Sequence, residues 1–309
     1  MADVPWLLLG RIAPLTLLIG LGFIAGRWLG VGSQHLASLM IFLLTPIIVF
    51  VGTLQTPVAG PLLLMPLVVW GLAAANGLVF LFVGRRTFGD GRANLLALAT
   101  GCGNTGYFGI PVALTLLGAE NLGLYVVVML GVTLFENSLG FYLAARGRSS
   151  AAEAFARVAR LPSLYAFFAA LVLQRTGFAL PATWQPLLGQ IQGAYVVLGM
   201  MIIGIGLAGL RRANLQPLFL ILVLVGKFVG WPLLALLAVA IDVHLLHWYA
   251  PLVHQALLLV SLMPVAANTV VIAALLNTHP QTVATATLVS TLLALVTLPW
   301  SAHWLGIGV

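Results

Sequence analysis

The chain has 309 residues, of which 62% are hydrophobic and 6% are charged, and its mean hydropathy is +1.14. This composition excludes a soluble globular domain: apolar runs of about 20 residues recur along the chain, and a helix needs that length to cross a bilayer. The formal net charge of +7 comes from arginines scattered near the ends of these runs, so no nucleic-acid partner is expected.

The apolar runs predict an all-α polytopic membrane protein with ten transmembrane helices, surrounded by the lipid bilayer. Most connections between the runs are short, and the longest of them, 146–160, is polar and basic. The expected spans are 6–29, 35–54, 61–84, 94–117, 121–144, 162–180, 190–210, 215–240, 251–277 and 281–302.

Arginine placement predicts the orientation, because cytoplasmic loops of membrane proteins carry an excess of Lys and Arg. With the N-terminus outside, the arginine groups at the span ends fall in the cytoplasm and only Arg175 falls outside. An even number of spans then places the C-terminus outside as well, and the expected location is the inner (plasma) membrane. The cytoplasmic arginines are Arg27, Arg85, Arg86, Arg92, Arg146, Arg148, Arg157, Arg160, Arg211 and Arg212.

The chain divides into two similar halves. Residues 1–145 form a first repeat of five spans, 146–160 a basic cytoplasmic loop, and 161–309 a second repeat of five spans. Because five is an odd number, the second repeat must be inverted in the membrane relative to the first. Inverted repeats of this kind are typical of secondary transporters.

The fourth span of each half is interrupted by residues that disrupt helices. The stretch Gly101–Gly118 contains five glycines, the pair Asn104-Thr105 and Pro111. The ninth span contains the corresponding features, which are Met263-Pro264 and Asn268-Thr269. Matched breaks in inverted halves indicate where a transporter binds its substrate, and we expect the two broken helices to cross there.

Such breaks have a chemical consequence at membrane depth. Proline removes a backbone donor and glycine lets another backbone approach, so N–H and C=O groups are freed where only a protein-lined or wet cavity can satisfy them. The N-termini of the half-helices would present partial positive charge to an anion, and the Asn and Thr side chains would add hydrogen bonds. The alternative is a proline kink whose backbone is repaired by the polar residues.

At these residues the sequence resembles a known family. The segments NTGYFGIP (104–111) and MPVAANT (263–269) are similar to signature segments of the auxin efflux carrier family, which includes bacterial membrane transport proteins. Pro46, Asn137 and the spacing from Lys227 to Pro232 also resemble the family. The long central hydrophilic loop of many plant members is absent here.

The resemblance implies a fold shared with the bile acid/sodium symporter superfamily. In that fold the first two spans of each half (the first, second, sixth and seventh) form a scaffold, and the other six (the third to fifth and eighth to tenth) form a mobile transport domain. It also implies a homodimer and elevator-type alternating access. The residues expected to contact the substrate are Asn104, Thr105, Gly106, Pro111, Asn137, Pro264, Asn268, Thr269 and Arg11.

Three charged residues lie within predicted spans. Glu136 is deep in the fifth span, and we interpret it as a proton or cation coupling site or as a structural partner of Lys227. Lys227, in the eighth span, has an electrostatic or structural role or attracts an anionic substrate. Arg11 either extends to the outer surface or pairs with an anion in the cavity.

No metal site or cofactor is expected. Cys102 is the only cysteine, and no nucleotide-binding loop is present. His244, His247 and His254 have a spacing that could ligate a metal beside Asp242, but we interpret them as interfacial histidines at the outer ends of spans.

These patterns together predict a secondary transporter of a small organic anion, a carboxylate, driven by protons, by the membrane potential or by the substrate gradient. The first alternative is a sodium-coupled symporter closer to the bile acid branch, in which Asn, Thr and backbone oxygens hold Na⁺. A more distant alternative is an intramembrane enzyme. It would need a nucleophile and a base at the same membrane depth, and the sequence does not provide this pair. A channel would need a charge ring or filter repeat that the sequence does not show.

Overall fold

The computed structural model describes residues 4–145, 150, 152, 156, 159–209 and 215–308, and the regular secondary structure of this part of the chain is entirely helical. The prediction of an all-α protein is therefore confirmed for the described residues. Most of the expected loop 146–160 and the arginine pair at 211–212 lie outside them.

In the first half, most helices are joined end to end by short 3-10 or π turns. The helices are α1 (Val4–Trp28), α2 (Ser33–Leu39), α3 (Thr45–Gln55), α4 (Met65–Thr87), α5 (Arg92–Gly101), α6 (Gly109–Leu116), α7 (Leu122–Phe135) and α8 (Phe141–Ala144). The turns are the π segments η1 (Met40–Leu44) and η4 (Glu136–Gly140) and the 3-10 segments η2 (Gly60–Leu64) and η3 (Ala119–Asn121).

The second half is built in the same way. Its helices are α10 (Pro162–Arg175), α11 (Gln185–Ala208), α12 (Pro217–Val225), α13 (Trp231–Ile241), α14 (Pro251–Ser261), α15 (Asn268–Leu275) and α16 (Pro280–Trp304). Its short segments are the 3-10 turn η5 (Ala182–Trp184) and the π turns η6 (Gly226–Gly230) and η7 (Asp242–Leu246).

Seven helical stretches of the described chain are long and apolar enough to cross a membrane, and each corresponds to one of the ten expected spans. They are Leu9–Trp28, His35–Gln55, Gly60–Thr87, Ala119–Ala144, Ala182–Ala208, Pro217–Leu246 and Pro280–Trp304.

The other three expected spans contain shorter helices. The span 94–117 is divided into α5 and α6, and 251–277 is divided into α14 and α15. The span 162–180 contains α10, whose 14 residues reach about 21 Å along a helix axis, less than the hydrocarbon core of about 30 Å.

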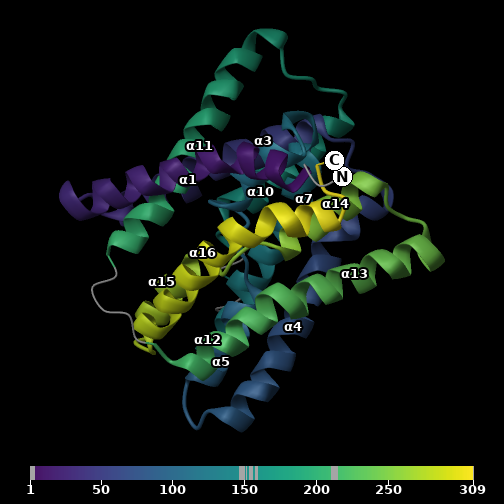
Figure 1. Ribbon diagram of the computed structural model, residues 1–309. Helices are drawn as coiled ribbons and strands as arrows, with labels where there is room; N and C mark the ends of the chain where they lie inside the picture. Colours follow the sequence, from purple (N-terminus) through teal and green to yellow (C-terminus); the bar gives the residue numbers. More distant parts are fainter. Residues whose placement is uncertain are drawn as a thin grey trace.

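The longest helices pack closely through small residues. A Cβ atom on Gly22 of α1 would overlap the backbone of Met201 in α11, and one on Gly204 of α11 would overlap the backbone of Ile19. Glycine therefore lets α1 and α11 touch backbone to backbone, as small residues do between membrane helices. Figure 1 shows α1 crossing α11, and α3 packs along α10.

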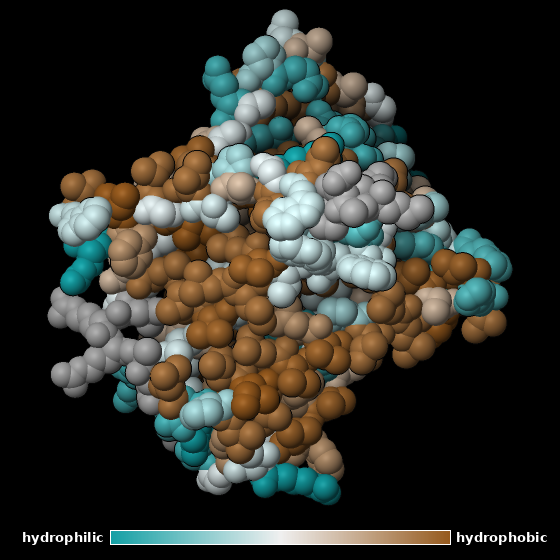
Figure 2. Space-filling view, in the orientation of Figure 1, coloured by the Kyte–Doolittle hydropathy of each residue, from teal (hydrophilic) through white to brown (hydrophobic). Residues whose placement is uncertain are grey.

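Apolar side chains cover much of the outside of the molecule. Figure 2 shows a wide hydrophobic area across the middle of this face and hydrophilic residues toward its upper and lower ends. The exposed large apolar residues include Leu17, Phe42, Leu67, Val172 and Leu233. A soluble protein rarely exposes contiguous apolar surface on this scale, whereas a membrane protein presents it to lipid. The two ends of the described chain lie together, since the ring centres of Trp6 and Trp300 are 5.9 Å apart.

Candidate functional site

The first interruption separates α5 from α6 and covers residues 102–108. Glycine is required on both sides of it. A Cβ atom on Gly101 would overlap the ring of Phe135, and one on Gly109 would overlap the hydroxyl of Tyr125. Pro111 is the third residue of α6, where its missing N–H removes no helical hydrogen bond.

The second interruption separates α14 from α15 and covers residues 262–267. Pro264 lies inside it and cannot donate a backbone hydrogen bond. The N–H of Val265 is freed from the helix and donates instead to Oγ of Ser290 in α16, at 3.1 Å. α15 then begins at Asn268.

The two interruptions are in direct contact. The backbone N–H of Asn104 donates to the carbonyl oxygen of Pro264 at 2.8 Å, and the Cβ of Met263 would lie 3.4 Å from a Cβ on Gly103. Segments about 160 residues apart in the sequence thus satisfy each other's freed backbone groups, as the interior of a membrane protein requires. The expected meeting of the two broken helices is therefore present in the structure.

Four residues that sequence reasoning did not single out hold the interruptions in place. Besides Ser290, they are Asn76 of α4, Tyr125 of α7 and Trp231 of α13. The Asn76 amide donates to the carbonyls of Thr100 at 2.8 Å and Gly226 at 3.0 Å. The Tyr125 hydroxyl donates to Thr105 O at 2.9 Å, and the Trp231 indole donates to Gly101 O at 3.2 Å. The sequence signal for Asn76 is that it is a lone amide side chain within the apolar run 61–84.

One cavity beside the contact contains a buried carboxyl group, and we call it the Glu136 cavity. Its volume is about 150 Å³, and α7, α11, η1, η4 and both interruptions contribute to its wall. Glu136 is only 7% exposed, and its Oε1 accepts a hydrogen bond of 2.9 Å from Nδ2 of Asn268. The polar groups around it come from Thr45, Asn104, Thr105, Tyr107, Thr133, Asn137, Ser163, Tyr195 and Asn268.

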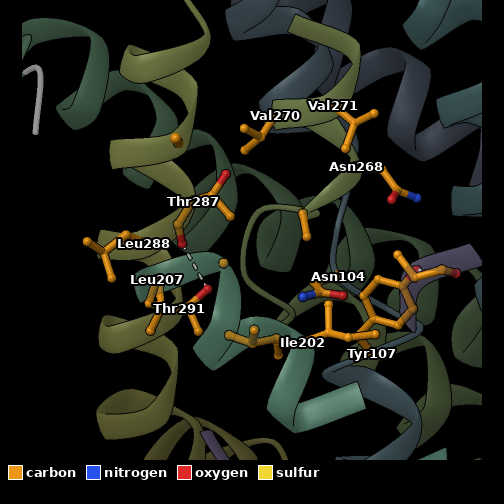
Figure 3. A pocket seen from close by; sticks show the side chains of 15 residues that line it. Asn104, Tyr107, Ile202, Leu207, Asn268, Val270, Val271, Thr287, Leu288 and Thr291 are labelled. Carbon is orange, nitrogen blue, oxygen red and sulfur yellow. Dashed lines mark hydrogen bonds between the residues drawn. The ribbon is translucent and has the colours of Figure 1, made fainter. Parts of the chain in front are cut away.

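A second cavity, of about 170 Å³, lies between α11, α15 and α16, and we call it the apolar cavity. Ile202, Leu207, Val270 and Leu288 supply apolar side chains, and Thr287 and Thr291 supply hydroxyl groups (Figure 3). Asn104, Tyr107, Ala267 and Asn268 line both cavities. The contact between the two interruptions therefore forms the boundary between a polar and an apolar compartment.

Most of the predicted substrate residues are gathered here. Asn104, Thr105, Gly106, Asn137 and Asn268 line the Glu136 cavity together with Glu136 itself, and Pro264 supplies the carbonyl at the contact.

Three predicted substrate residues lie elsewhere. Arg11 is on an exposed face of α1, and the structure does not bring it to either cavity. Pro111 is buried in α6. Thr269 is buried, and its hydroxyl donates to Ala266 O in the second interruption at 2.6 Å, so it lines neither cavity.

Lys227 lies in the π turn η6 and is 1% exposed. Its ammonium is 5.4 Å from the centre of the Trp231 ring, and it would be 3.2 Å from a Cβ on Gly103. Lys227 thus places a basic group against the first interruption without lining either cavity. The π turns η4 and η6 hold the buried charged residues Glu136 and Lys227, and π turns are local helix distortions of the kind that often occur at functional sites.

A structural cluster of polar groups lies where the eighth expected span is followed by the ninth. Asp242 accepts hydrogen bonds from the backbone N–H groups of Trp248 and Tyr249, and its Oδ2 lies 2.8 Å from Nε2 of His254. Burial and the charge of Asp242 raise the pKa of the Tyr249 phenol. The described residues contain no group of three or more His, Cys, Asp or Glu side chains that could hold a metal ion.

Comparison with known proteins adds an independent observation. No family model matches the chain. The chain is 26% identical over 203 residues to an uncharacterized transporter of Methanothermobacter thermautotrophicus, an alignment that covers 63% of this chain and 67% of the relative. It is 27% identical over 186 residues to an uncharacterized transporter of Methanocaldococcus jannaschii, covering 57% of this chain and 60% of the relative. These likenesses support a membrane transporter. The seven long apolar helices independently indicate a multi-pass membrane protein.

Proposed function

We propose that the protein is a secondary transporter of a small organic anion, a carboxylate, and that the anion binds where the two interrupted helices meet. The observation that carries the proposal is the hydrogen bond from Asn104 N–H to Pro264 O, because it joins two broken helices beside the polar, protein-lined Glu136 cavity. Broken helices of this kind form the binding sites of secondary transporters. The relatives named as transporters favour transport over intramembrane catalysis.

The polarity of the site supports an anion. α6 and α15 each have eight residues, and both begin next to the contact, so their N-termini contribute partial positive charge there. Lys227 adds a buried basic group against the first interruption. The amides of Asn104, Asn137 and Asn268 can donate hydrogen bonds to a carboxylate.

The packing supports an elevator-type mechanism. α1 packs along α11 and α3 along α10, and these two pairs support a scaffold made of the first, second, sixth and seventh expected spans. Both interruptions and Glu136 belong to the remaining spans, which would form the transport domain. We extend the proposal to ten spans in two inverted repeats and to a homodimer through the scaffold in the plasma membrane, with both termini outside.

With that orientation, we interpret the structure as an inward-facing state. Ala37, Ser163, Gly206 and Ala284 lie near the cytoplasmic ends of their expected spans, and all four line one of the two cavities. These positions support cavities that extend from the contact toward the cytoplasm. On the outer side, the Tyr125 hydroxyl and the Met263 sulfur lie against Gly109.

The proposal is tested by transport currents from proteoliposomes on a solid-supported membrane. Small mono- and dicarboxylates, aromatic acids and amino acids are applied with and without sodium at two pH values. We expect a current for at least one carboxylate, and Asn104→Ala should abolish it in folded protein. A full current in this variant would contradict a site at the contact, and a current that requires sodium would favour the sodium-coupled alternative.

A further inference from the structure

Asn268 connects the buried carboxyl group to both cavities. It is the first residue of α15, it lines both compartments, and its Nδ2 donates to Oε1 of Glu136 at 2.9 Å. The two residues are 132 positions apart in the sequence. In Figure 3 the Asn268 nitrogen is turned away from the other labelled side chains of the apolar cavity.

This arrangement is unfavourable for binding an anion. An ionised carboxylate accepts hydrogen bonds and donates none, so Glu136 in that form holds the nitrogen of Asn268. A substrate carboxylate needs the same nitrogen. If it approached the second N–H, it would stand beside the Glu136 charge, and two carboxylates that share one site do not both stay ionised.

We propose that protonation of Glu136 reverses the Asn268 amide and thereby opens the site to a carboxylate. The neutral Glu136 carboxyl then donates its O–H to Oδ1 of Asn268. Rotation of the amide by half a turn frees Nδ2 to donate to the substrate at the boundary of the two cavities. This inference rests on the proposed function, and it assigns the coupling ion as a proton taken up from the cytoplasmic side.

The other ionisable groups around Glu136 come from three elements. Cys102 and Tyr107 belong to the first interruption, Tyr195 belongs to α11, and Lys227 belongs to η6. Thiols and phenols ordinarily titrate at a pH of about 8.5 and about 10. Among the residues that line the two cavities, Glu136 is the only acid, and no His lines either one.

A measurement without substrate tests the amide reversal directly. The protein is prepared in liposomes with ¹³C-labelled glutamate and ¹⁵N-labelled asparagine for solid-state NMR, and Glu136→Gln and Asn268→Ala assign the two signals. We expect a dipolar contact between Glu136 Cδ and Asn268 Nδ2 at high pH. It should weaken as the Glu136 carboxyl shift moves to its protonated value. An unchanged contact after protonation would overturn the proposal.

The matched functional test uses benzoate and malonate as probes, with currents recorded between pH 5.5 and 8. If binding needs one proton, the apparent Kd rises tenfold per pH unit above the pKa of Glu136. Glu136→Gln resembles the protonated acid because its amide can donate to Oδ1, so its apparent Kd should vary less than about twofold over this range. The control is Asn121→Ala, at the far end of the same helical run, which should keep the wild-type slope.

Asn268→Ala separates the amide reversal from simple charge repulsion. If protonation acts through the amide, this variant should bind the probes weakly and with little pH dependence. A tenfold slope that survives in Asn268→Ala would show that the Glu136 charge acts directly and would overturn the amide reversal. If neither probe gives a current with the wild type or any variant, the result would count against the proposed function. The NMR contact would still decide the amide reversal.

Discussion

The contact between Gly109 and Tyr125 offers the most direct test of how the first interruption is held. In the structure the Tyr125 hydroxyl donates to Thr105 O at 2.9 Å, and the ring is fully buried. A methyl group at position 109 would occupy the place of that hydroxyl and would lie 3.0 Å from the ring carbon Cζ and 3.1 Å from the Met263 sulfur. Gly109→Ala must therefore displace a buried ring that has little free space.

The magnitude follows from two contributions. Overpacking in a dense interior costs about 1–3 kcal/mol, and loss of the hydrogen bond to Thr105 O adds about 1 kcal/mol. We expect Gly109→Ala to lower the apparent unfolding temperature in detergent by about 5–10 °C. The matched control is Gly193→Ala in α11, where nothing lies within 4 Å of the added Cβ. That variant should be neutral or slightly more stable, because alanine favours a helix over glycine.

A double-mutant cycle identifies the cause. Tyr125→Phe removes the hydroxyl, so it loses the hydrogen bond by itself but also removes the atom that the new methyl group would overlap. The effects of Gly109→Ala and Tyr125→Phe should therefore be non-additive, with the double variant less destabilised than the sum by at least about 1 kcal/mol. Additive effects, or a wild-type unfolding temperature for Gly109→Ala, would refute this account of the interruption.

Three further predictions concern the rest of the fold. Ser290→Ala should lower stability by about 1–3 kcal/mol, because the buried N–H of Val265 loses its acceptor; an unchanged unfolding temperature would mean that another group satisfies it. Burial raises the pKa of Asp90, but hydrogen bonds and the charge of Arg92 outweigh this and lower it. The stabilisation from Asp90 is thus present above its ordinary pKa of about 3.9 and is lost as the pH falls through the lower folded value. Asp90→Asn should consequently flatten the unfolding temperature over that acidic range, and a profile identical to wild type would refute the role of the pair. Ser150→Cys should resist labelling by an impermeant maleimide added to intact cells, whereas ready labelling would reverse the proposed orientation.

The sequence by itself determined the local properties of the chain. Runs of apolar residues predicted the membrane helices, and seven of the ten expected spans are present as long apolar helices. Proline, glycine and the Asn-Thr pairs predicted both interruptions, because these residues act on the backbone within a turn of their own position. The isolated charges Glu136 and Lys227 were predicted to lie within spans for the same local reason, and both are buried in the structure.

Only the tertiary structure decided which of these residues meet. α1 and α16 are apolar on all sides, so no amphipathic pattern indicates which face of these helices points inward. For that reason the sequence could not show that Arg11 lies on an exposed face, or that the Asn268 amide contacts Glu136. The rotation and depth of each helix are set by packing against helices far away in the chain. Asn76 therefore contacts the end of α5 and the π turn η6, a result that no local signal contains.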